Sequence, residues 1–435
     1  MRNKSINTKS FQEKGWLTLD NAAKLFPAIV SNDLTSVFRI TAFLKEPIKY
    51  SALKEAVELT AKRFPYFSVS LGSGLFWHFL EFNNRPPHIH AEGEIPCTAF
   101  ALKRRSEPLY RIIVKGSRIS VEFIHILTDG GGALEYLKSL LYTYLTIAGK
   151  NIRFPGDIIL PGTPLSEEEL EDGYNRFFRK LPRPVKLVKA WHLPFRLNER
   201  PRLRIICSEL NVNEILELTR RHKVTVTEYL VSVYMFSLQE IFNSSKRKRK
   251  MEKRRVLRIE VPVNMRNKFP IRTMRNFSLF VLPELDLRLG TYTFEEILIS
   301  VHHQLQISTD IKQISRFLSS NVSYEKLYIV RVLPLFIKKI VIAAIYRGLG
   351  ARRFSGLMTN MGLVTIPAEM SEEIESIELI SPPPNNKVKV TCAVISYEDK
   401  LRISFSNITQ SQELERSFFR HLAIAGIHVK ILNRN

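Results

Sequence analysis

A proline-rich segment near the middle of the chain restricts the fold more than any other feature. Seven of the 22 prolines lie between Pro155 and Pro201. Each proline fixes one backbone angle and removes an N–H donor, so we expect no long helix or strand in this segment. At 435 residues the chain is also too long for one ordinary core. These features predict an N-terminal lobe (1–154), a crossover (155–205) and a C-terminal lobe (206–435).

Both halves contain strand-like and helix-like patterns. Apolar side chains alternate with polar or small ones along Phe38–Leu44 and, most clearly, along Val256–Arg266. Helical spacing occurs as well, for example over Leu210–Arg221. The mixture predicts an α+β (mixed α/β) fold class. We expect the polar face of 256–266, which carries Arg258 and Glu260, to line solvent or a cleft.

The chain is strongly basic. Its formal net charge of +23 favours anionic partners such as a phosphorylated cofactor, membrane head groups or nucleic acid. Eight of the ten residues in 246–255 are Lys or Arg. Such a run is typical of a solvated loop, and guidance of an anionic cofactor or surface stays open as an alternative.

Cysteine usage and hydropathy indicate a cytoplasmic protein. The three cysteines, Cys97, Cys207 and Cys392, are odd in number and widely spaced, which excludes a disulfide framework and a zinc pattern. No apolar run follows the basic N-terminus, so we expect no secretory signal. Charged residues interrupt the most apolar stretch, Leu327–Leu349, before about 18 apolar residues accumulate. We therefore expect a buried or interfacial helix there and no transmembrane span.

The motif that carries chemistry is His125-Ile-Leu-Thr-Asp129-Gly130. A histidine ends a predicted strand, an aspartate follows four residues later, and three glycines open a predicted helix. Neutral imidazole can accept a proton from a hydroxyl or amine as that group attacks a carbonyl, and glycines let a substrate approach the backbone closely. Composition alone predicts roughly 0.008 such motifs in a chain of this length.

This motif resembles the HxxxDG motif of the superfamily that contains chloramphenicol acetyltransferase, condensation domains and the plant BAHD acyltransferases. Further segments are similar, in order, to bacterial alcohol-acetyltransferase-like members, so the resemblance extends over nearly the whole chain. These segments are Trp16–Asp20, Arg63–Phe67, Gly74–Trp77, Val261–Arg266, Arg275–Phe277 and Thr359–Gly362.

The resemblance implies a fold and a reaction. Two similar lobes, each a mixed sheet with helices, would enclose an active-site tunnel. His125 would be the general base that moves an acyl, for example acetyl, group from acyl-CoA, the co-substrate, to a small alcohol or amine. No permanently bound cofactor is implied.

The resemblance also assigns supporting residues. Asp129 would form a structural ion pair with an arginine, and Arg266, on the polar face of its strand, is the candidate partner. Asn264 shares that face and is expected to support the site together with Gly130. Asn360, in the Thr-Asn-Met-Gly segment, would lie near the reacting carbonyl.

Two alternatives stay open. A condensation-like enzyme would take its acyl group from a carrier protein, which the basic surface could dock. Against it, Ile124 replaces the first of the two adjacent histidines that condensation domains usually have, and we recognise no carrier-protein segment. A catalytically idle acyltransferase-like binding protein would use the basic loops to bind an anionic surface, but the intact His125 and Asp129 favour an enzyme. Nucleic acid is not expected as a partner, whereas peripheral membrane contact stays open.

No metal site is expected. His302 and His303 are adjacent in a predicted helix and do not share a face, so they make a poor pair of ligands. His88 and His90 share a strand face, but no third ligand is evident in the sequence.

Overall fold

The computed structural model describes most of the chain. The described residues are 5–6, 15–83, 85–104, 108–153, 155–185, 187–245, 255–346 and 350–432. The basic run 246–255 lies outside them except for Arg255, so its proposed roles stay predictions.

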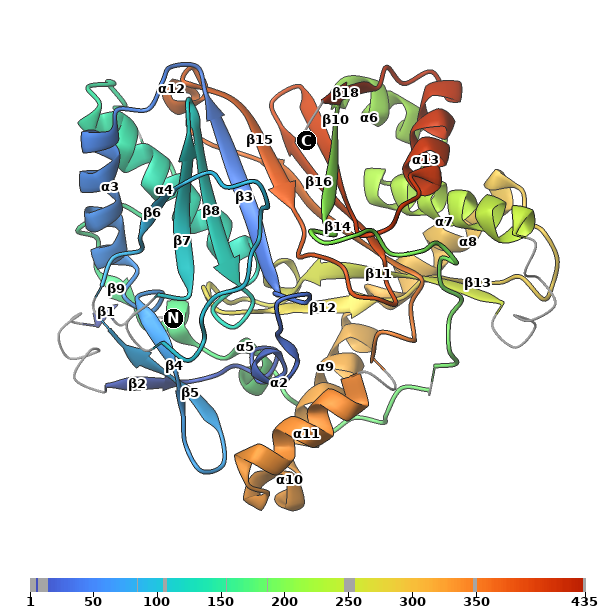
Figure 1. Cartoon of the computed structure of the whole chain (residues 1–435), viewed down its shortest axis with the longest axis horizontal. Helices are drawn as coiled ribbons and strands as arrows, with labels where there is room; N and C mark the ends of the chain where they lie inside the picture. The colour runs from blue at the N-terminus through green and yellow to red at the C-terminus, as the bar shows by residue number, and fades with distance from the viewer. Residues whose placement is uncertain are drawn as a thin grey trace.

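The first large sheet has five strands in the order β15-β3-β8-β7-β6 (Figure 1). Helices α3 (Tyr50–Arg63) and α4 (Gly130–Ile147) pack on one another, and their apolar side chains share one core with the sheet. One strand comes from far along the chain, because β15 pairs antiparallel with β3. The strands are β3 (Val37–Leu44), β6 (Ile89–Ala91), β7 (Tyr110–Lys115), β8 (Arg118–Ile124) and β15 (Ile374–Ile380).

The second large sheet has eight strands. Seven follow the order β12-β11-β14-β16-β17-β10-β18, and β13 pairs with β11. They are β10 (Arg204–Asn211), β11 (Val256–Asn264), β12 (Ser278–Val281), β13 (Glu284–Asp286), β14 (Gly356–Val364), β16 (Val390–Tyr397), β17 (Lys400–Asn407) and β18 (Lys430–Leu432). The helices of its core are α6 (Val212–Arg221), α7 (Val226–Ser244), α8 (Phe294–Ser308) and α13 (Glu413–Ile424).

Smaller elements complete the molecule. Two small sheets are formed by β2 (Trp16–Thr18), β5 (His78–Phe82) and β4 (Val69–Ser73), and by β1 (Ser5–Ile6) with β9 (Leu165–Ser166). The remaining helices are α2 (Phe26–Ile29), α5 (Gly173–Arg176), α9 (Ile311–Lys326), α10 (Tyr328–Val332), α11 (Leu335–Ile345) and α12 (Ala368–Ser371), with 3-10 turns η1 (Glu167–Leu170) and η3 (Met265–Asn267).

The predicted fold class is confirmed: the molecule is a two-lobed mixture of sheets and helices (Figure 1). The lobe boundaries at 154 and 205 stay predictions. In the described part of 155–205 the regular elements are short up to β10, as the prolines predict. The predicted helix over Leu210–Arg221 begins later, at Val212, because β10 continues to Asn211, whose side chain then caps α6.

The alternation along β11 is partly confirmed. Leu257, Ile259 and Val261 enter the core of the second sheet. On the other face, which we expected to line solvent or a cleft, Arg258 and Glu260 are buried, whereas Asn264 at the end of the strand is exposed. The physical reason for Arg258 is that the crossover covers it: its guanidinium donates to the Val188 carbonyl oxygen (2.9 Å) and pairs with Glu284.

No helix in the described ranges is both long and apolar enough to cross a bilayer. The apolar stretch that begins at Leu327 forms two short helices, α10 and α11, which are separated at Pro334. Many of their apolar side chains are exposed.

Candidate active site

His125 lies directly after β8, where the chain turns toward α4. Its backbone N–H donates to the Ser36 carbonyl oxygen (3.0 Å), and its own carbonyl oxygen accepts from Asn276 Nδ2 (2.9 Å). The half-buried imidazole stacks on the Phe26 ring, with centroids 5.5 Å apart and planes 16° apart, and its centroid is 4.6 Å from that of Phe38. Two phenylalanine rings of the first half thus pack against the imidazole, and Asn276 of the second half holds the His125 backbone.

The environment of His125 keeps its imidazole neutral. Burial lowers the pKa of the imidazole below its usual value of 6.5, and the negative charge of Asp129 opposes this shift only in part. A neutral ring at neutral pH can accept a proton from an attacking group.

The Asp129 carboxylate contacts both the N-terminus of α4 and residues of the second lobe. Its Oδ1 accepts from the backbone N–H groups of Gly131 (3.1 Å) and Gly132 (3.3 Å), which caps α4. Its Oδ2 accepts from the Phe277 N–H (2.7 Å) and from Arg266 Nη1 (2.9 Å). Both oxygens thus accept hydrogen bonds, and the carboxylate bridges the start of α4 and the segment that carries Arg266 and Phe277.

The predicted partner of Asp129 is therefore present. Arg266 also donates to Asn264 Oδ1 (3.2 Å) and to the carbonyl oxygens of Thr273 (2.7 Å) and Arg275 (2.5 Å). The Asn264 side chain caps η3 through the Arg266 N–H (3.1 Å) and so helps to orient the guanidinium.

Arg266 and the backbone N–H groups around Asp129 keep its carboxyl ionised. Burial by itself would raise the pKa of the carboxyl. The charge of Arg266 and the amide hydrogen bonds outweigh burial and hold this pKa below its usual value.

Close packing explains the glycines of the motif. A Cβ on Gly132 would lie 2.2 Å from Thr128 Oγ1 and 2.5 Å from the Met274 carbonyl oxygen, so only glycine fits there. A Cβ on Gly130 would meet Met361 Sδ at 3.1 Å. The strictest steric demand thus falls on Gly132, where the second lobe approaches α4, rather than on Gly130.

Asn360 lies in β14, on the segment that approaches the start of α4. Its Nδ2 donates to Thr227 Oγ1 (3.0 Å), and its Oδ1 accepts from the Gly362 N–H (2.8 Å) at a bulge in the strand. The next residue, Met361, is the one that lies over Gly130. This places Asn360 near the motif, and its position near a reacting carbonyl stays a prediction.

The sequence analysis did not identify Asn276 and Asp20, which support the backbone of His125. Asn276 is buried, and its Nδ2 also donates to Asp20 Oδ2 (3.1 Å). Burial raises the pKa of Asp20 to about 6, against the opposing charge of Arg275. The available signal was that Trp16–Asp20 and Arg275–Phe277 both belong to the segments similar to the superfamily, but nothing in the sequence brings them together.

The described residues contain no group of three or more His, Cys, Asp or Glu side chains placed to hold a metal ion. The rings of His88 and His90 lie 6.0 Å apart, and His302 is hydrogen-bonded to Glu228 (3.1 Å).

Comparisons with known proteins identify the fold. No protein-family model matches the sequence, and a search of curated proteins gave no match. Solved structures do match. TRI101 of F. sporotrichioides, complexed with coenzyme A and T-2, is 11% identical and has a TM-score of 0.61 over 96% of this chain and 100% of its own.

Two further solved structures match nearly the whole chain. Polyketide synthase associated protein 5 from Mycobacterium tuberculosis is 14% identical, with a TM-score of 0.59 over 93% of this chain and 96% of its own. The first condensation domain of the calcium-dependent antibiotic synthetase is 15% identical, with a TM-score of 0.58 over 94% and 96%. The chain therefore has the two-lobed fold shared by chloramphenicol-acetyltransferase-like enzymes and condensation domains.

Proposed function

We propose that this chain is an acyltransferase that moves an acyl group from a CoA thioester to an alcohol or amine. The observation that carries the proposal is the neutral, half-buried imidazole of His125, which packs against Phe26 and Phe38 near the Asp129–Arg266 ion pair. A matching structure that contains coenzyme A, and another whose name is trichothecene 15-O-acetyltransferase, support a CoA donor.

In the proposed reaction, an imidazole nitrogen of His125 takes the proton from the acceptor O–H or N–H. The freed oxygen or nitrogen forms a bond to the thioester carbonyl carbon, which becomes tetrahedral. The C–S bond then breaks, and the leaving CoA thiolate takes the proton from the imidazolium. The base is thereby restored, and the products are an ester or amide and CoA.

Asp129 and Arg266 act at a distance in this mechanism. Their ion pair holds the turn between His125 and α4 against the second lobe, so the ring keeps its orientation while the reaction proceeds. We include an alcohol-acetyltransferase-like specificity in the proposal, on the sequence segments similar to that subgroup.

The test is release of free CoA thiol by the purified protein. Acyl-CoAs of several lengths are offered with a panel of alcohols and amines, and the same acyl groups are offered on a carrier protein. We expect CoA release that depends on an acceptor, and a loss of about 10²–10⁴ in rate for His125→Ala. His302→Ala, on α8 and outside the site, is the matched control and should retain the wild-type rate.

The outcomes separate the alternatives. Activity only with carrier-bound donors would support the condensation-like reading. Failure of every donor with a folded protein would support an idle binding protein. An unchanged rate in folded His125→Ala would exclude His125 as the base.

A further inference from the structure

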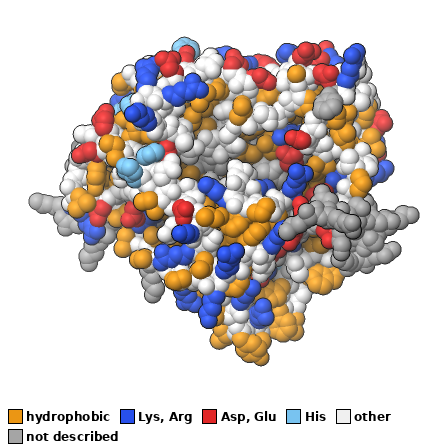
Figure 2. All heavy atoms as spheres, turned by 180° about the vertical axis from the view of Figure 1, so that it is seen from behind, with side chains coloured by type: hydrophobic (Ala, Val, Ile, Leu, Met, Phe, Trp, Pro, Cys, Tyr) orange, Lys and Arg blue, Asp and Glu red, His pale blue; other side chains and the backbone are white. Residues whose placement is uncertain are grey.

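An exposed apolar surface projects from the second lobe at helices α10 and α11. Helices α10 and α11 form a protrusion at the lower edge of the molecule in Figure 1, and Figure 2 shows hydrophobic side chains gathered at the same end with Lys and Arg beside them. We call this surface the apolar foot. Its residues are Tyr328 (80% exposed), Ile329 (69%), Val332, Phe336 (67%), Ile340 (68%) and Ile345.

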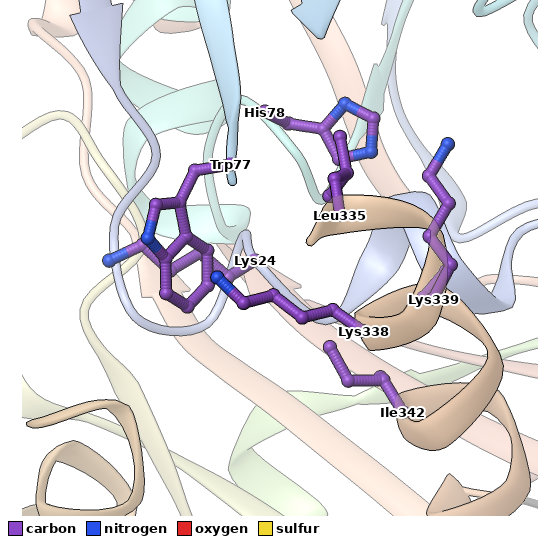
Figure 3. Close-up of a pocket in the computed structure, with 8 residues that line it drawn as sticks. Lys24, Trp77, His78, Leu335, Lys338, Lys339 and Ile342 are labelled. Carbon is purple, nitrogen blue, oxygen red and sulfur yellow. The ribbon is translucent and has the colours of Figure 1, made fainter. Parts of the chain in front are cut away.

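The foot is anchored firmly to the rest of the fold. The ammonium group of Lys338 donates to the carbonyl oxygens of Phe76 (2.9 Å) and Arg331 (3.2 Å) and lies 3.5 Å from the centre of the Trp77 ring. Figure 3 shows Lys338 beside Trp77, with Lys24 on the same ring (Figure 3). The Leu335 N–H also donates to the carbonyl oxygen of Leu75 (2.8 Å), so α11 is attached to the β4–β5 turn.

The segment that forms the foot carries charge of one sign. Residues 326–346 include Lys326, Arg331, Lys338 and Lys339 and no acidic residue. Lys326 and Arg331 are exposed beside the apolar side chains. The nearby Glu325 is already paired with Lys24.

We propose that the apolar foot docks on an anionic lipid bilayer. Apolar side chains with lysine and arginine at their border match a membrane interface, where the apolar groups enter the acyl region and the cations meet acidic head groups. Tyrosine, here the exposed Tyr328, is enriched at that depth. Helices of five and 11 residues are far too short to span a bilayer, which requires about 20 residues, so the foot lies in the interface plane.

A second copy of the chain fits less well. A symmetric dimer through the foot would bring the same cations of both copies together, and like charges across an interface oppose association. An anionic bilayer instead offers a continuous surface of opposite charge.

The foot also lies close to the candidate site. Helix α11 packs against α2, and Phe26 of α2 stacks on the His125 ring. Docking would therefore hold the site near the bilayer surface. The docking proposal itself rests on the foot alone and does not depend on the proposed acyl transfer.

Vesicle flotation of the whole protein tests the proposal. We expect the wild type to float with vesicles of phosphatidylcholine and phosphatidylserine and to float much less with phosphatidylcholine alone. The triple variant Ile329→Ser, Phe336→Ser, Ile340→Ser should bind the mixed vesicles at least about tenfold more weakly for each side chain that no longer enters the lipid. The matched control changes two exposed apolar residues elsewhere, Leu289→Ser (82% exposed) and Ile424→Ser (74%), and should bind as the wild type does.

Further measurements keep the test decisive. The double variant Arg331→Gln, Lys339→Gln should lose the preference for phosphatidylserine, and melting curves should show all variants folded. Binding by the triple variant equal to wild type would assign membrane attraction to the general positive charge and overturn the proposal. A wild type that does not float, but forms dimers that the triple variant cannot form, would assign the foot to a second copy.

Discussion

The surroundings of Asp129 and the apolar foot depart from ordinary folding in opposite directions. At Asp129 a charge is buried, and four donors of the same chain offset the cost of removing it from water. At the foot, large apolar side chains stay in contact with water although they belong to well-anchored helices. The chain itself supplies the partners that offset the buried charge. The apolar side chains of the foot would be removed from water only by a surface outside the chain. Buried polar networks and exposed apolar patches therefore point to different kinds of function.

The strongest test of this comparison is Asp129→Asn. The substitution keeps the size of the side chain but leaves Arg266 without its counter-charge. We expect the free energy of unfolding to fall by about 3–5 kcal/mol and activity to fall with it. Denaturant unfolding and CoA release measure the two effects. The control is Asp310→Asn at the exposed cap of α9, where Asn caps as well as Asp and the change should stay within about 0.5 kcal/mol. Normal stability with low activity would instead give Asp129 a direct part in the chemistry.

A smaller effect is expected from Asn276→Ala. The variant removes the donor shared by Asp20 and the His125 carbonyl oxygen, and a buried acceptor left without a partner costs about 1–3 kcal/mol. Because the His125 backbone is no longer held, we expect kcat to fall about tenfold while KM changes little. Asn175→Ala, which removes an exposed amide bonded to Asp172, controls for loss of an asparagine. If Asn276→Ala loses stability but keeps the wild-type kcat, then Asn276 has only a structural role.

The pH profile gives a finer measure of the site. Since burial holds the pKa of His125 below 6.5, kcat/KM should rise with pH as the ring loses its proton and should level off by about pH 7. The negative charge of Asp129 favours the protonated ring. Its removal in Asp129→Asn should therefore move the acid limb to still lower pH, provided that enough activity remains to measure. A limb that moves upward would contradict the assigned electrostatics.

The smallest effect should come from the foot. Ile340→Ser removes an apolar side chain from water, so the stability of the free protein should change by no more than about 0.5 kcal/mol. Activity toward short, water-soluble acceptors should also stay unchanged in the absence of lipid. A destabilisation of several kcal/mol would show that Ile340 packs against the protein itself, and the comparison between the two regions would fail.

Much of the fold and part of the site could be predicted because their signals are local. Alternating side chains identified β11, and the histidine, aspartate and glycines of the motif are close together in sequence. The pairing of Asp129 with Arg266 also followed, since both belong to segments similar to one superfamily.

The rest depends on contacts between distant segments. Nothing near Asn276 or Asp20 in sequence indicates that the two meet behind His125. Apolar spacing along 327–346 predicts helices, but it does not say whether the chain covers them, and the structure leaves the foot exposed. The burial of Arg258 likewise depends on where the crossover passes.

The membership of β15 in the first sheet has a consequence for synthesis. Strand β3 pairs on one edge with β8 and on the other with β15, which begins at Ile374 and is therefore synthesised much later. At about 5–20 residues per second, a ribosome needs on the order of 15–70 s to add the roughly 330 residues between β3 and β15. During that time β3, whose side chains are mostly apolar, presents an open edge to other nascent chains. The five-stranded sheet can be completed only after residues 374–380 have been synthesised. Until then the open edge of β3 must be kept from pairing with other chains.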